Sequence, residues 1–271
     1  MRVVIYSGWT KSGGSTEAFI ELTNALNEAG IDTTFYGPHR EHLTRCKSGL
    51  CFSLNDLKTV KATTLVSHFC LLPSRQTLPF EKVILSCHET NVYPLTETIV
   101  NPADLVHLVS KTQFDWHLDY SKTKFFFKPY NIIPNIIPKI ELPKGINHMG
   151  QYAGVIGSID RHKQTHVSIQ RAIDDGYIPL LFGAVTDTEY YTTYVFPFII
   201  KTQAFMMGIV ERSKMYSSFS RVYHSSLRET FNYVKAECES IGMPYFGMMR
   251  NDPQVNYLSK EDVVKEWIKI V

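Results

Sequence analysis

Short apolar runs alternate with amphipathic stretches along the chain, and this alternation predicts strands and helices in turn. Residues 2–8 and 31–37 are apolar runs of strand length, and residues 15–30 between them have the helical period. The chain therefore opens as a βαβ unit, which predicts a parallel sheet. Further runs rich in branched residues predict more buried strands, at 63–69, 82–87 and 105–110.

The first predicted helix carries signals at both ends. Its apolar positions share one face and include Phe19, Leu22 and Leu26. Ser15 or Thr16 is suited to cap its start, because either hydroxyl can accept a hydrogen bond from an N–H of the first turn. Gly30 is suited to end it, because glycine readily adopts the left-handed conformation found there.

Residues 130–150 contain three prolines, so this segment is expected to be neither a continuous helix nor a central strand. We interpret it as the linker between two domains. A second alternation follows, with apolar runs at 151–158, 178–184, 205–210, 221–226 and 244–247. The helices of this half are expected at 166–176, around 188–199, at 211–219, from about 231 to 241, and at 259–271.

Two successive α/β series predict the fold class α/β, with two Rossmann-like domains whose parallel sheets face a central cleft. We expect an N-terminal domain at 1–145 and a C-terminal domain at 146–257. A closing helix at 258–271 is expected to pack back on the N-terminal domain. Ligands of such folds bind at the carboxyl ends of the strands, so the loops that follow strands hold the candidate sites.

The composition is that of an ordinary globular protein of 271 residues, with 44% hydrophobic and 20% charged residues. A net charge of +2 gives no support to a strongly electrostatic nucleic-acid binder. We see no signal-peptide pattern and no apolar run long enough to span a bilayer, so a cytoplasmic location is expected. The cysteines show no zinc spacing, although two of them could pair locally, and we interpret all as reduced thiols. They are Cys46, Cys51, which could pair with it, Cys70, Cys87 and Cys238.

The loop after the first strand nearly matches the phosphate-binding pattern G-x-x-x-x-G-K-[ST]. Gly8, Gly13 and Ser15 are in place. Gly14 stands where the lysine belongs, and that lysine holds nucleotide phosphates, so its absence argues against an NTPase. The glycine pair suits close approach of a ligand to the backbone, and it suits a simple tight turn equally well.

Two further loops carry candidate polar groups. His88 follows the strand at 82–87, at the edge where ligands of this fold class bind. A histidine there is also common as an ordinary satisfied polar residue. Arg161 and Lys163 follow the strand at 151–158 and precede a helix, where basic groups suit a diphosphate. A solvated basic loop explains the same two residues.

Two glutamates eight positions apart, Glu229 and Glu237, mark the last candidate site. With a helix from about Phe231, Glu229 lies in the loop before the helix and Glu237 lies inside it. The start of a helix is a place where phosphate groups bind. Acids near a helix start also offset the helix dipole without any ligand.

Taken in order, these stretches resemble the retaining GT4 family of glycosyltransferases, which have the GT-B fold. That family reads G-R-L-x-x-x-K-G after a strand of the second domain, then P-S-x-x-E-G-F-G-x-x-x-x-E-A and G-x-P. Here "GSIDRHK" and "HSSLRETFNYVKAECESIGMP" stand in those places. The matching positions are Lys163, Glu229, Glu237, Gly242 and Pro244, and the looser first-domain likeness rests on Gly13, Gly14, Ser15 and the pair His88-Glu89.

The chain departs from the family pattern at several positions. Ser158 stands in place of the family arginine, and Arg161 is the residue that could substitute for it. Thr230 and Asn232 replace glycines that let backbone N–H groups approach the donor. The chain is also short for the family, which suggests trimmed loops.

The resemblance implies a retaining hexosyltransferase that moves a sugar from a nucleotide-diphosphate sugar, such as UDP-glucose or GDP-mannose, to an acceptor hydroxyl. It implies that Glu229 holds donor-sugar hydroxyls, Glu237 the ribose, and that His88 lies near the anomeric carbon. The other residues implied at the donor are Gly13, Gly14, Ser15, Ser158, Arg161, Lys163, Thr230, Phe231, Asn232 and Tyr233.

No metal or cofactor is expected, because the metal-dependent D-x-D motif is absent and basic groups at a helix start can stabilise a leaving diphosphate. The nearest match, "DTE" at 187–189, is interpreted as a helix start. The implied partners are the nucleotide sugar and a glycan, protein or small-molecule acceptor, with no nucleic acid. Two alternatives stay open: a nucleotide-sugar epimerase of GT-B fold, and a non-catalytic nucleotide-sugar-binding protein.

Overall fold

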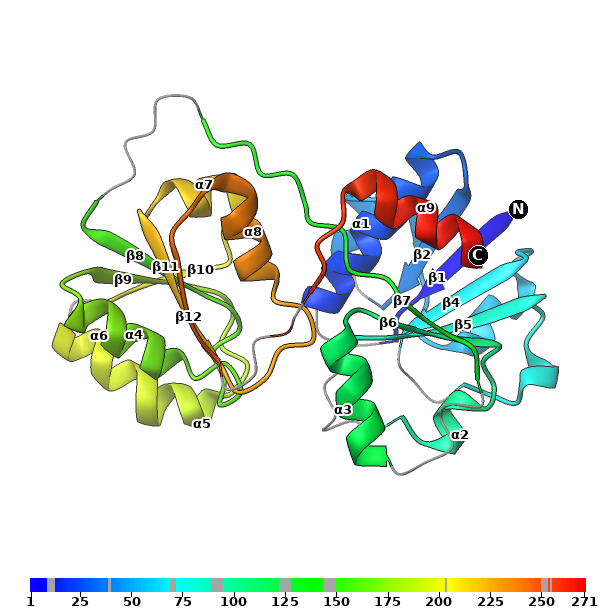
Figure 1. Ribbon diagram of the computed structural model, residues 1–271, viewed down its shortest axis with the longest axis horizontal. Helices are drawn as coiled ribbons and strands as arrows, with labels where there is room; N and C mark the ends of the chain where they lie inside the picture. Colours follow the sequence, from blue (N-terminus) through cyan, green and yellow to red (C-terminus); the bar gives the residue numbers. More distant parts are fainter. Residues whose placement is uncertain are drawn as a thin grey trace. The chain divides into compact units, whose positions relative to one another are not determined.

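The computed structural model describes residues 1–8, 13–38, 40–68, 72–88, 95–121, 128–143, 150–202, 204–249, 253 and 255–271. It divides the chain into two compact units (Figure 1). Unit 1 consists of Met1–Ile136 and Pro253–Val271, and unit 2 of Ile137–Asp252. The sequence pattern placed the two boundaries at 146 and 258.

Unit 1 is built on a seven-stranded sheet in the order β3-β2-β1-β4-β5-β6-β7, with every pair parallel. The order reverses between β1 and β4. The strands are β1 Arg2–Tyr6, β2 Asp32–Gly37, β3 Ser48–Leu50, β4 Thr64–His68, β5 Lys82–Cys87, β6 Leu105–Leu108 and β7 Tyr130–Ile132. The α-helices of this unit are α1 Gly14–Glu28, α2 Glu97–Val100, α3 Lys111–Ser121 and α9 Lys260–Ile270, and short 3₁₀ turns lie at Glu41–Thr44, Leu54–Thr59 and Arg75–Thr77.

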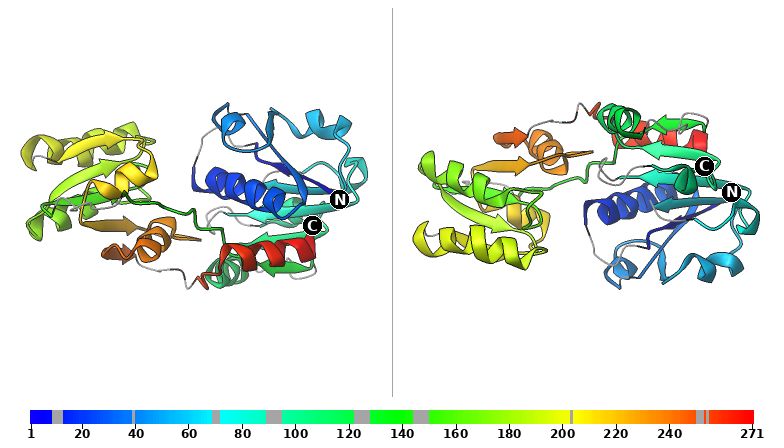
Figure 2. Two further views of the ribbon diagram at one scale, coloured as in Figure 1. Left: turned by 90° about the horizontal axis from the view of Figure 1, so that it is seen from above. Right: turned by 90° about the horizontal axis from the view of Figure 1, so that it is seen from below.

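Unit 2 is built on a five-stranded parallel sheet in the order β10-β9-β8-β11-β12, and its order reverses between β8 and β11. Helices lie on both faces of the sheet in each unit (Figure 2). The strands are β8 Tyr152–Ile156, β9 Ile178–Phe182, β10 Phe205–Gly208, β11 Arg221–Ser226 and β12 Tyr245–Met249. The helices are α4 Thr165–Asp174, α5 Thr188–Tyr190, a π-helical turn Tyr191–Val195, α6 Phe196–Thr202, α7 Arg212–Ser217 and α8 Tyr233–Ile241.

The predicted pattern of parallel strands and intervening helices is confirmed in both units. The sequence pattern missed β3, β7 and α3. β3 and β7 have only three residues each and lie at the edges of the sheet, so they are too short to show a period. β7 begins the proline-containing segment as an edge strand, where the sheet tolerates neighbouring prolines.

Two predicted helix starts are wrong, for local reasons. α1 begins at Gly14 with Gly13 at the N-cap position, so Ser15 and Thr16 lie inside the first turn and make no capping hydrogen bond. α8 begins at Tyr233 rather than at Phe231, because the side chain of the residue between them caps the helix. The predicted end of α1 is confirmed, because Gly30 follows the helix with a φ of +83°.

The C-terminal helix α9 belongs to unit 1, where it lies beside α1 (Figure 1). Ser259 caps it by accepting a hydrogen bond from the N–H of Asp262 at 3.1 Å. Its apolar face, which includes Val263 and Trp267, packs into the same core as Phe19 of α1. Burial of this face fixes the end of the chain against the first sheet.

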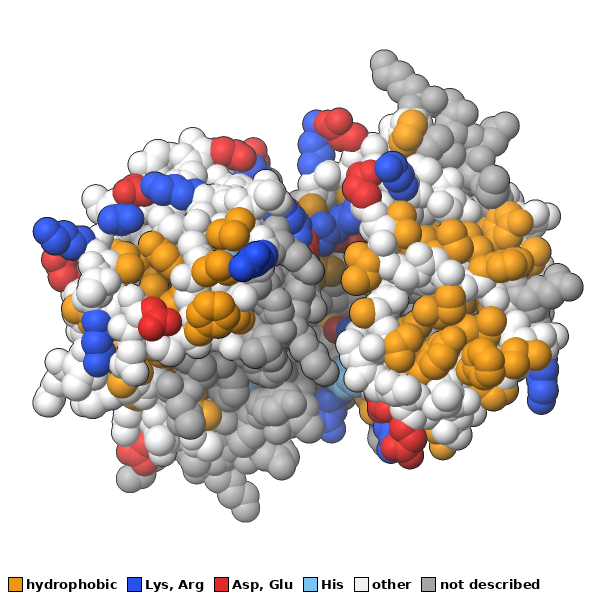
Figure 3. Space-filling model, turned by 180° about the vertical axis from the view of Figure 1, so that it is seen from behind, with side chains coloured by type: hydrophobic (Ala, Val, Ile, Leu, Met, Phe, Trp, Pro, Cys, Tyr) orange, Lys and Arg blue, Asp and Glu red, His pale blue; other side chains and the backbone are white. Residues whose placement is uncertain are grey.

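The surface of unit 2 carries exposed apolar side chains near its edge strand β10, and Figure 3 shows hydrophobic groups on one face of the unit. They include Ile200, Phe205, Met207 and Ile209. Among the described residues, no helix combines the length and the apolar character needed to cross a membrane. The described cysteines are thiols and not disulfides, so Cys46 and Cys51 are not paired with each other; Cys70 lies outside the described residues.

Candidate functional site

The reversal of strand order between β8 and β11 places the loops after these two strands at a topological switch point of unit 2. The loops cover residues 157–164 and 227–232. The N–H of Leu227 donates to the carbonyl of His162 at 2.9 Å, and Nε2 of His162 donates to the carbonyl of Arg228 at 2.6 Å. These bonds join the loops into one polar surface at the carboxyl edge of the sheet.

A charged cluster lies at the centre of this surface. Nζ of Lys163 donates to Oε1 of Glu229, which joins residues 66 positions apart in the sequence. His224, on β11, contacts the same Oε1 through Nε2 at 3.3 Å and the carbonyl of Ile156 through Nδ1 at 3.2 Å. Both partners are hydrogen-bond acceptors. The cluster thus places a lysine and a histidine ring around one carboxylate.

The pKa of Glu229 follows from this environment. The residue is 9% exposed, and burial by itself raises the pKa of its carboxyl group. The charge of Lys163, with the hydrogen bond and charge of His224, outweighs burial and lowers the pKa to about 2. Glu229 is therefore ionised at neutral pH and can accept hydrogen bonds from hydroxyl groups.

Asp160 organises the loop after β8. Its Oδ1 accepts a hydrogen bond from the N–H of Lys163 at 2.9 Å. Its Oδ2 accepts from the hydroxyls of Ser158 at 2.6 Å and Thr186 at 3.1 Å. The loop leaves the sheet through Gly157, whose φ of +138° favours glycine. Ser158, which stands in place of the family arginine, thus holds the loop that carries the lysine.

Arg161 forms ion pairs outside the charged cluster. Its guanidinium lies 3.2 Å from Asp187 and 2.8 Å from Glu189. Asp187 also accepts a hydrogen bond from the N–H of Tyr190 at 2.9 Å and so starts α5, which confirms the helix start predicted for "DTE". The described ion pairs of Arg161 therefore neutralise it locally, and its contact with a phosphate stays a prediction.

The segment between Glu229 and α8 is a packed connection. Its buried residues are Thr230, Phe231 and Asn232. Oδ1 of Asn232 accepts a hydrogen bond from the N–H of Lys235 at 3.1 Å and caps α8 at Tyr233. Its Nδ2 donates to the hydroxyl of Tyr245 at 2.8 Å. The side chain that replaces the second family glycine therefore has a structural task of its own.

Glu237 lies within α8 and is 4% exposed. Arg212, at the start of α7, donates from Nε to Oε1 of Glu237 at 2.9 Å. The hydroxyl of Tyr216 donates to Oε2 at 2.7 Å. Glu237 thus joins α8 to α7 through both of its carboxylate oxygens.

Unit 1 has its own switch point, between β1 and β4. There the hydroxyl of Ser7 lies 2.9 Å from Nδ1 of the buried His68. His88 follows β5 at the same edge and is partly exposed. Its ring packs edge-on against Phe19 at 4.8 Å and against His68 at 5.6 Å. Burial, and then the neighbouring His68 and His107, lower the pKa of His88 well below its usual value; Glu89 lies outside the described residues.

The glycine-rich loop is described from Gly13 onward. Gly13 and Gly14 are exposed and Ser15 is partly buried. Gly13 has an extended φ of −164°, and a Cβ added to it would meet nothing within 4 Å. Neither strain nor packing against the described residues therefore requires glycine at position 13. The open space above it is what close approach of a ligand needs.

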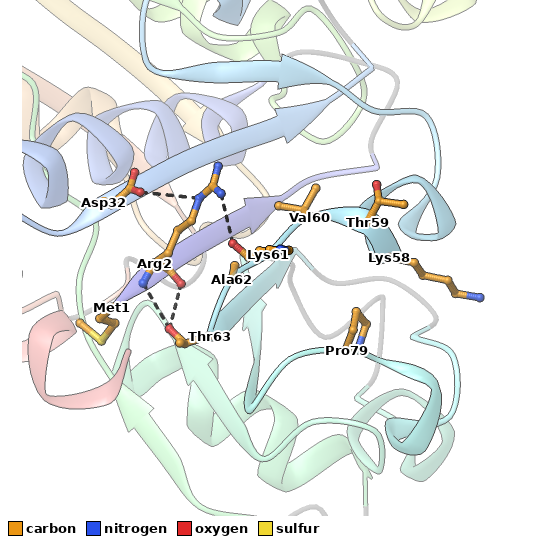
Figure 4. A pocket seen from close by; sticks show the side chains of 10 residues that line it. All are labelled: Met1, Arg2, Asp32, Lys58, Thr59, Val60, Lys61, Ala62, Thr63 and Pro79. Carbon is orange, nitrogen blue, oxygen red and sulfur yellow. Dashed lines mark hydrogen bonds and ion pairs between the residues drawn. The ribbon is translucent and has the colours of Figure 1, made fainter.

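A pocket of about 730 Å³ opens at the opposite edge of the first sheet, at the amino ends of β1, β2 and β4 (Figure 4). Arg2 reaches between Asp32, at 3.6 Å, and the carbonyl of Lys61, at 3.1 Å. The pocket contains none of the residues that the sequence singled out. Within the described parts of the chain, no group of three or more His, Cys, Asp or Glu side chains is placed to hold a metal ion.

No protein-family model matches the sequence, and no curated protein matches it. Solved structures do match. A glycosyltransferase from Rickettsia africae ESF-5 aligns with a TM-score of 0.68 and 11% identity over 99% of this chain and 87% of that chain. An α-glucosyltransferase in complex with UDP and a 13-mer DNA containing an HMU base aligns with a TM-score of 0.65 and 13% identity, over 100% of this chain and 89% of that chain.

The lipopolysaccharide outer core galactosyltransferase WaaB aligns with a TM-score of 0.59 and 13% identity, over 100% of this chain and 90% of that chain. The fold is GT-B. At identities this low the likeness concerns the fold, and the chemistry has to be argued from the residues of this chain.

Sequence reasoning missed several polar residues around the candidate site. They are Asp160, Arg212, Tyr216 and His224 in unit 2, and Ser86 and His107 in unit 1. One signal could have found His107: it is a polar residue in the otherwise apolar run 105–109, which predicts a buried strand. A buried polar side chain needs a partner: His224 contacts Glu229 directly, and His107 is linked to His88 through the hydroxyl of Ser86.

Proposed function

We propose that the chain is a glycosyltransferase that moves a sugar from a nucleotide-diphosphate sugar to an acceptor hydroxyl, with retention of configuration and without a metal ion. The observation that carries the proposal is the ion pair between Lys163 and Glu229 at the switch point of unit 2. Donor-type ligands of doubly wound folds bind at this position. The GT-B fold supplies the architecture in which such a transfer takes place.

The contact between Lys163 and Glu229 fits the chemistry of the donor. In a nucleotide sugar the anomeric carbon is bonded directly to a phosphate oxygen, so groups that bind the diphosphate and the sugar must lie close together. Lys163 is suited to the diphosphate as a compact cation. Glu229 is suited to sugar hydroxyls, because an ionised carboxylate accepts several hydrogen bonds.

The remaining donor contacts are proposals of the same kind. The N-termini of α4 and α8 lie at this edge and favour negative charge, so they add to the binding of the diphosphate. Glu237 is proposed to accept hydrogen bonds from ribose hydroxyls while it holds Arg212 and Tyr216. His88 of unit 1 is proposed to contact the transferred sugar.

The acceptor is the less defined half of the reaction. The sequence predicted a glycan, protein or small-molecule acceptor and no nucleic acid. One protein of the same fold is described in complex with UDP and a DNA containing an HMU base, so the fold does not exclude a nucleic-acid acceptor. Both alternatives to transfer, an epimerase and a non-catalytic binding protein, would use the same donor site in unit 2.

The test starts with binding and ends with turnover. A panel of nucleoside diphosphates is screened by thermal shift, because a ligand at 100 times its Kd stabilises the folded chain by about 2.7 kcal/mol. The preferred nucleotide sugar is then assayed for transfer, hydrolysis and epimerisation in parallel. Transfer to an acceptor supports the proposal, epimerisation without an acceptor identifies the first alternative, and binding without turnover identifies the second.

Glu229→Gln sharpens the assay. Glu229 is proposed to touch only the transferred sugar, so the variant should keep the affinity for the nucleoside diphosphate and lose turnover. The amide retains the size of the side chain and its contact with Lys163 as an acceptor. A variant that turns over like the parent would remove the main support for the proposal.

A further inference from the structure

A chain of hydrogen bonds runs under the carboxyl edge of unit 1 and ends at His88. The hydroxyl of Ser86, on β5, lies 3.1 Å from Nε2 of His88 and 2.8 Å from Nδ1 of His107, on β6. Nε2 of His107 lies 2.8 Å from the carbonyl oxygen of Ile133. Ser86 and His107 are fully or almost fully buried, at 0% and 1% exposure, so these contacts are not exchanged for water.

The proton positions along this chain follow from the end at the carbonyl oxygen of Ile133. The carbonyl of Ile133 can only accept, so Nε2 of His107 carries the proton that bonds to it. Burial lowers the pKa of His107 to about 4, so the ring is neutral at pH 7 and its Nδ1 is an acceptor. The hydroxyl of Ser86 must donate to that Nδ1. Its oxygen is then available to accept a hydrogen bond from Nε2–H of His88.

We propose that Ser86 and His107 are positioning residues that hold His88 in the tautomer with the proton on Nε2, so that Nδ1 serves as an acceptor for a hydroxyl of the substrate. The tautomer follows from the hydrogen-bond chain and from the neutral state of His88, whose pKa is lowered well below its usual value by burial. Only its use toward a substrate hydroxyl rests on the proposed function.

The surrounding rings fix the orientation of both histidines. Trp267 of α9 packs on His107 with ring centroids 4.5 Å apart, so the C-terminal helix covers the inner end of the chain. Phe19 packs edge-on against His88, and the ring of His107 lies 6.0 Å from that of His88. A ring held in this way cannot rotate freely to exchange its two nitrogens, so the tautomer also determines which atom acts.

The tautomer determines whether His88 accepts or donates the hydrogen bond in the proposed contact. With the proton on Nε2, Nδ1 binds a hydroxyl by accepting its proton in a hydrogen bond. With the proton on Nδ1, the same contact would make His88 a donor and would bind the hydroxyl oxygen. The outcome is set by the inner acceptor, the Ile133 carbonyl, two hydrogen-bonded side chains away.

The tautomers can be read directly by long-range ¹H–¹⁵N correlation spectra of the ligand-free protein, labelled with ¹⁵N-histidine and recorded at pH 7. Both His88 and His107 are expected in the Nε2–H form. An Nδ1–H form or an imidazolium form of His88 would overturn the proposal. No donor, acceptor or turnover is needed, so this result is independent of whether the chain is a glycosyltransferase.

A matched pair of variants tests the role of His107. In His107→Leu the Ser86 hydroxyl loses its acceptor and can donate to Nε2 of His88, so the proton of His88 is expected to move to Nδ1. In His107→Asn the side-chain carbonyl stands near the former Nδ1 position and accepts from Ser86, so His88 should stay in the Nε2–H form. An unchanged Nε2–H form in a folded His107→Leu variant would show that His107 does not position His88.

Two serine variants complete the test. Ser86→Ala should leave His88 as a mixture of tautomers, whereas Ser7→Ala, which removes the hydroxyl beside His68, should not change the tautomer of His88. In the transfer assay Ser86→Ala should lower kcat about tenfold with KM within about twofold, the size expected for one hydrogen bond. A tautomer change with unchanged kcat would refute the use of Nδ1 toward the substrate. Absence of any turnover in the parent would count against the proposed function and leave the tautomer result intact.

Discussion

The carboxyl edges of the two sheets use opposite kinds of polar chemistry. In unit 2 the switch point holds a charged pair, Lys163 and Glu229, beside the ring of His224, and the pKa of Glu229 is lowered to about 2. In unit 1 the corresponding edge holds neutral groups, in which Ser86 links His88 to His107 and the pKa of His107 is lowered to about 4. At both edges the inner groups, Glu229 and His107, are buried, so the difference comes from their partners.

The comparison shows how two sheets of the same type can suit two different parts of a ligand. A buried charge is held only beside an opposite charge, and such a cluster suits a charged ligand such as a diphosphate. A buried neutral relay binds no charge strongly, but it fixes the direction of each hydrogen bond and suits the hydroxyls of a sugar. The predictions below break the charged edge and the neutral edge separately.

The largest effect is expected from removing one member of the charged pair. Lys163→Met leaves the carboxylate of Glu229 without its lysine and should lower the free energy of unfolding by about 3 kcal/mol, as for other broken buried pairs. The double variant Lys163→Met/Glu229→Gln removes the orphaned charge and should recover most of the loss. Urea unfolding measures both, and equal losses in the single and double variants would mean that the pair is not buried.

Acid should destabilise the two units in different pH windows, each by about 3 kcal/mol. For His107 the pKa is about 4 when folded and near 6.5 when unfolded, so the unfolded chain binds more protons between these values. Its contribution to stability is present above pH 6.5 and is lost as the pH falls toward 4. For Glu229 the pKa is about 2 when folded and near 4.5 when unfolded, so its contribution is lost between pH 4.5 and 2.

Unit 1 should therefore lose stability at a higher pH than unit 2. The three tryptophans, Trp9, Trp116 and Trp267, all belong to unit 1, so their fluorescence reports on that unit alone. As the pH is lowered past 6.5, the urea concentration at the fluorescence midpoint should decrease. The urea midpoint of unit 2, followed by circular dichroism, should decrease only at lower pH. His107→Leu should reduce the pH dependence of the fluorescence midpoints, and His88, whose pKa is also lowered, should account for what remains. Coincident transitions at every pH would contradict the two-window scheme.

Removal of the lysine should affect the binding of a nucleoside diphosphate and of a nucleoside differently. A charge-assisted contact with phosphate is worth about 1.5–3 kcal/mol, so Lys163→Met should weaken nucleoside-diphosphate binding by roughly that amount and leave nucleoside binding nearly unchanged. Lys47→Met is the matched control, because Lys47 pairs with Asp32 in unit 1, away from the proposed donor. Calorimetric titration measures the affinities, and equal losses for both ligands would reduce Lys163 to a structural role.

A smaller effect should distinguish the two tasks of Glu237. Tyr216→Phe removes one hydrogen bond to the carboxylate and should lower the free energy of unfolding by about 1 kcal/mol without weakening nucleoside-diphosphate binding. Glu237→Gln should lower the stability by a similar amount and also weaken that binding, because the amide keeps only one acceptor oxygen and has no charge. The 2′-deoxy ligand should bind poorly to the parent, and if it binds as well as the ribose form, Glu237 only joins α7 to α8.

The smallest effect is expected from chelation. The positive charge of Lys163 and the helix starts at α4 and α8 are proposed to stabilise the leaving diphosphate, so excess EDTA should leave the transfer rate unchanged. The control adds manganese after EDTA. Loss of activity in EDTA that manganese restores would replace the metal-free scheme with a metal-dependent one.

The local pattern of the sequence was enough to predict most strands, most helices and the place of the two glutamates. Strand and helix periods are short-range properties, so they can be read from windows of a few residues. Glu229 before α8 and Glu237 within it were predicted correctly in this way. Edge strands such as β3 were not predicted, because three residues are too few to show the alternation of a strand.

Contacts between distant residues were decided only by the tertiary structure. Lys163 meets Glu229 because β8 and β11 are neighbours in the sheet, and nothing in either local sequence specifies that pairing. Arg161, two positions before the lysine, pairs with Asp187 and Glu189 instead.

The state of His88 is the clearest case of this division. The sequence by itself placed a histidine after the strand β5, at the edge where ligands bind. Which of its nitrogens carries the proton depends on Ser86, on His107 and on the carbonyl of Ile133, which three different parts of unit 1 supply. The sequence therefore determined which chemical groups are available, and the folded structure determined their protonation and direction, because both depend on partners that only the order of the strands brings together.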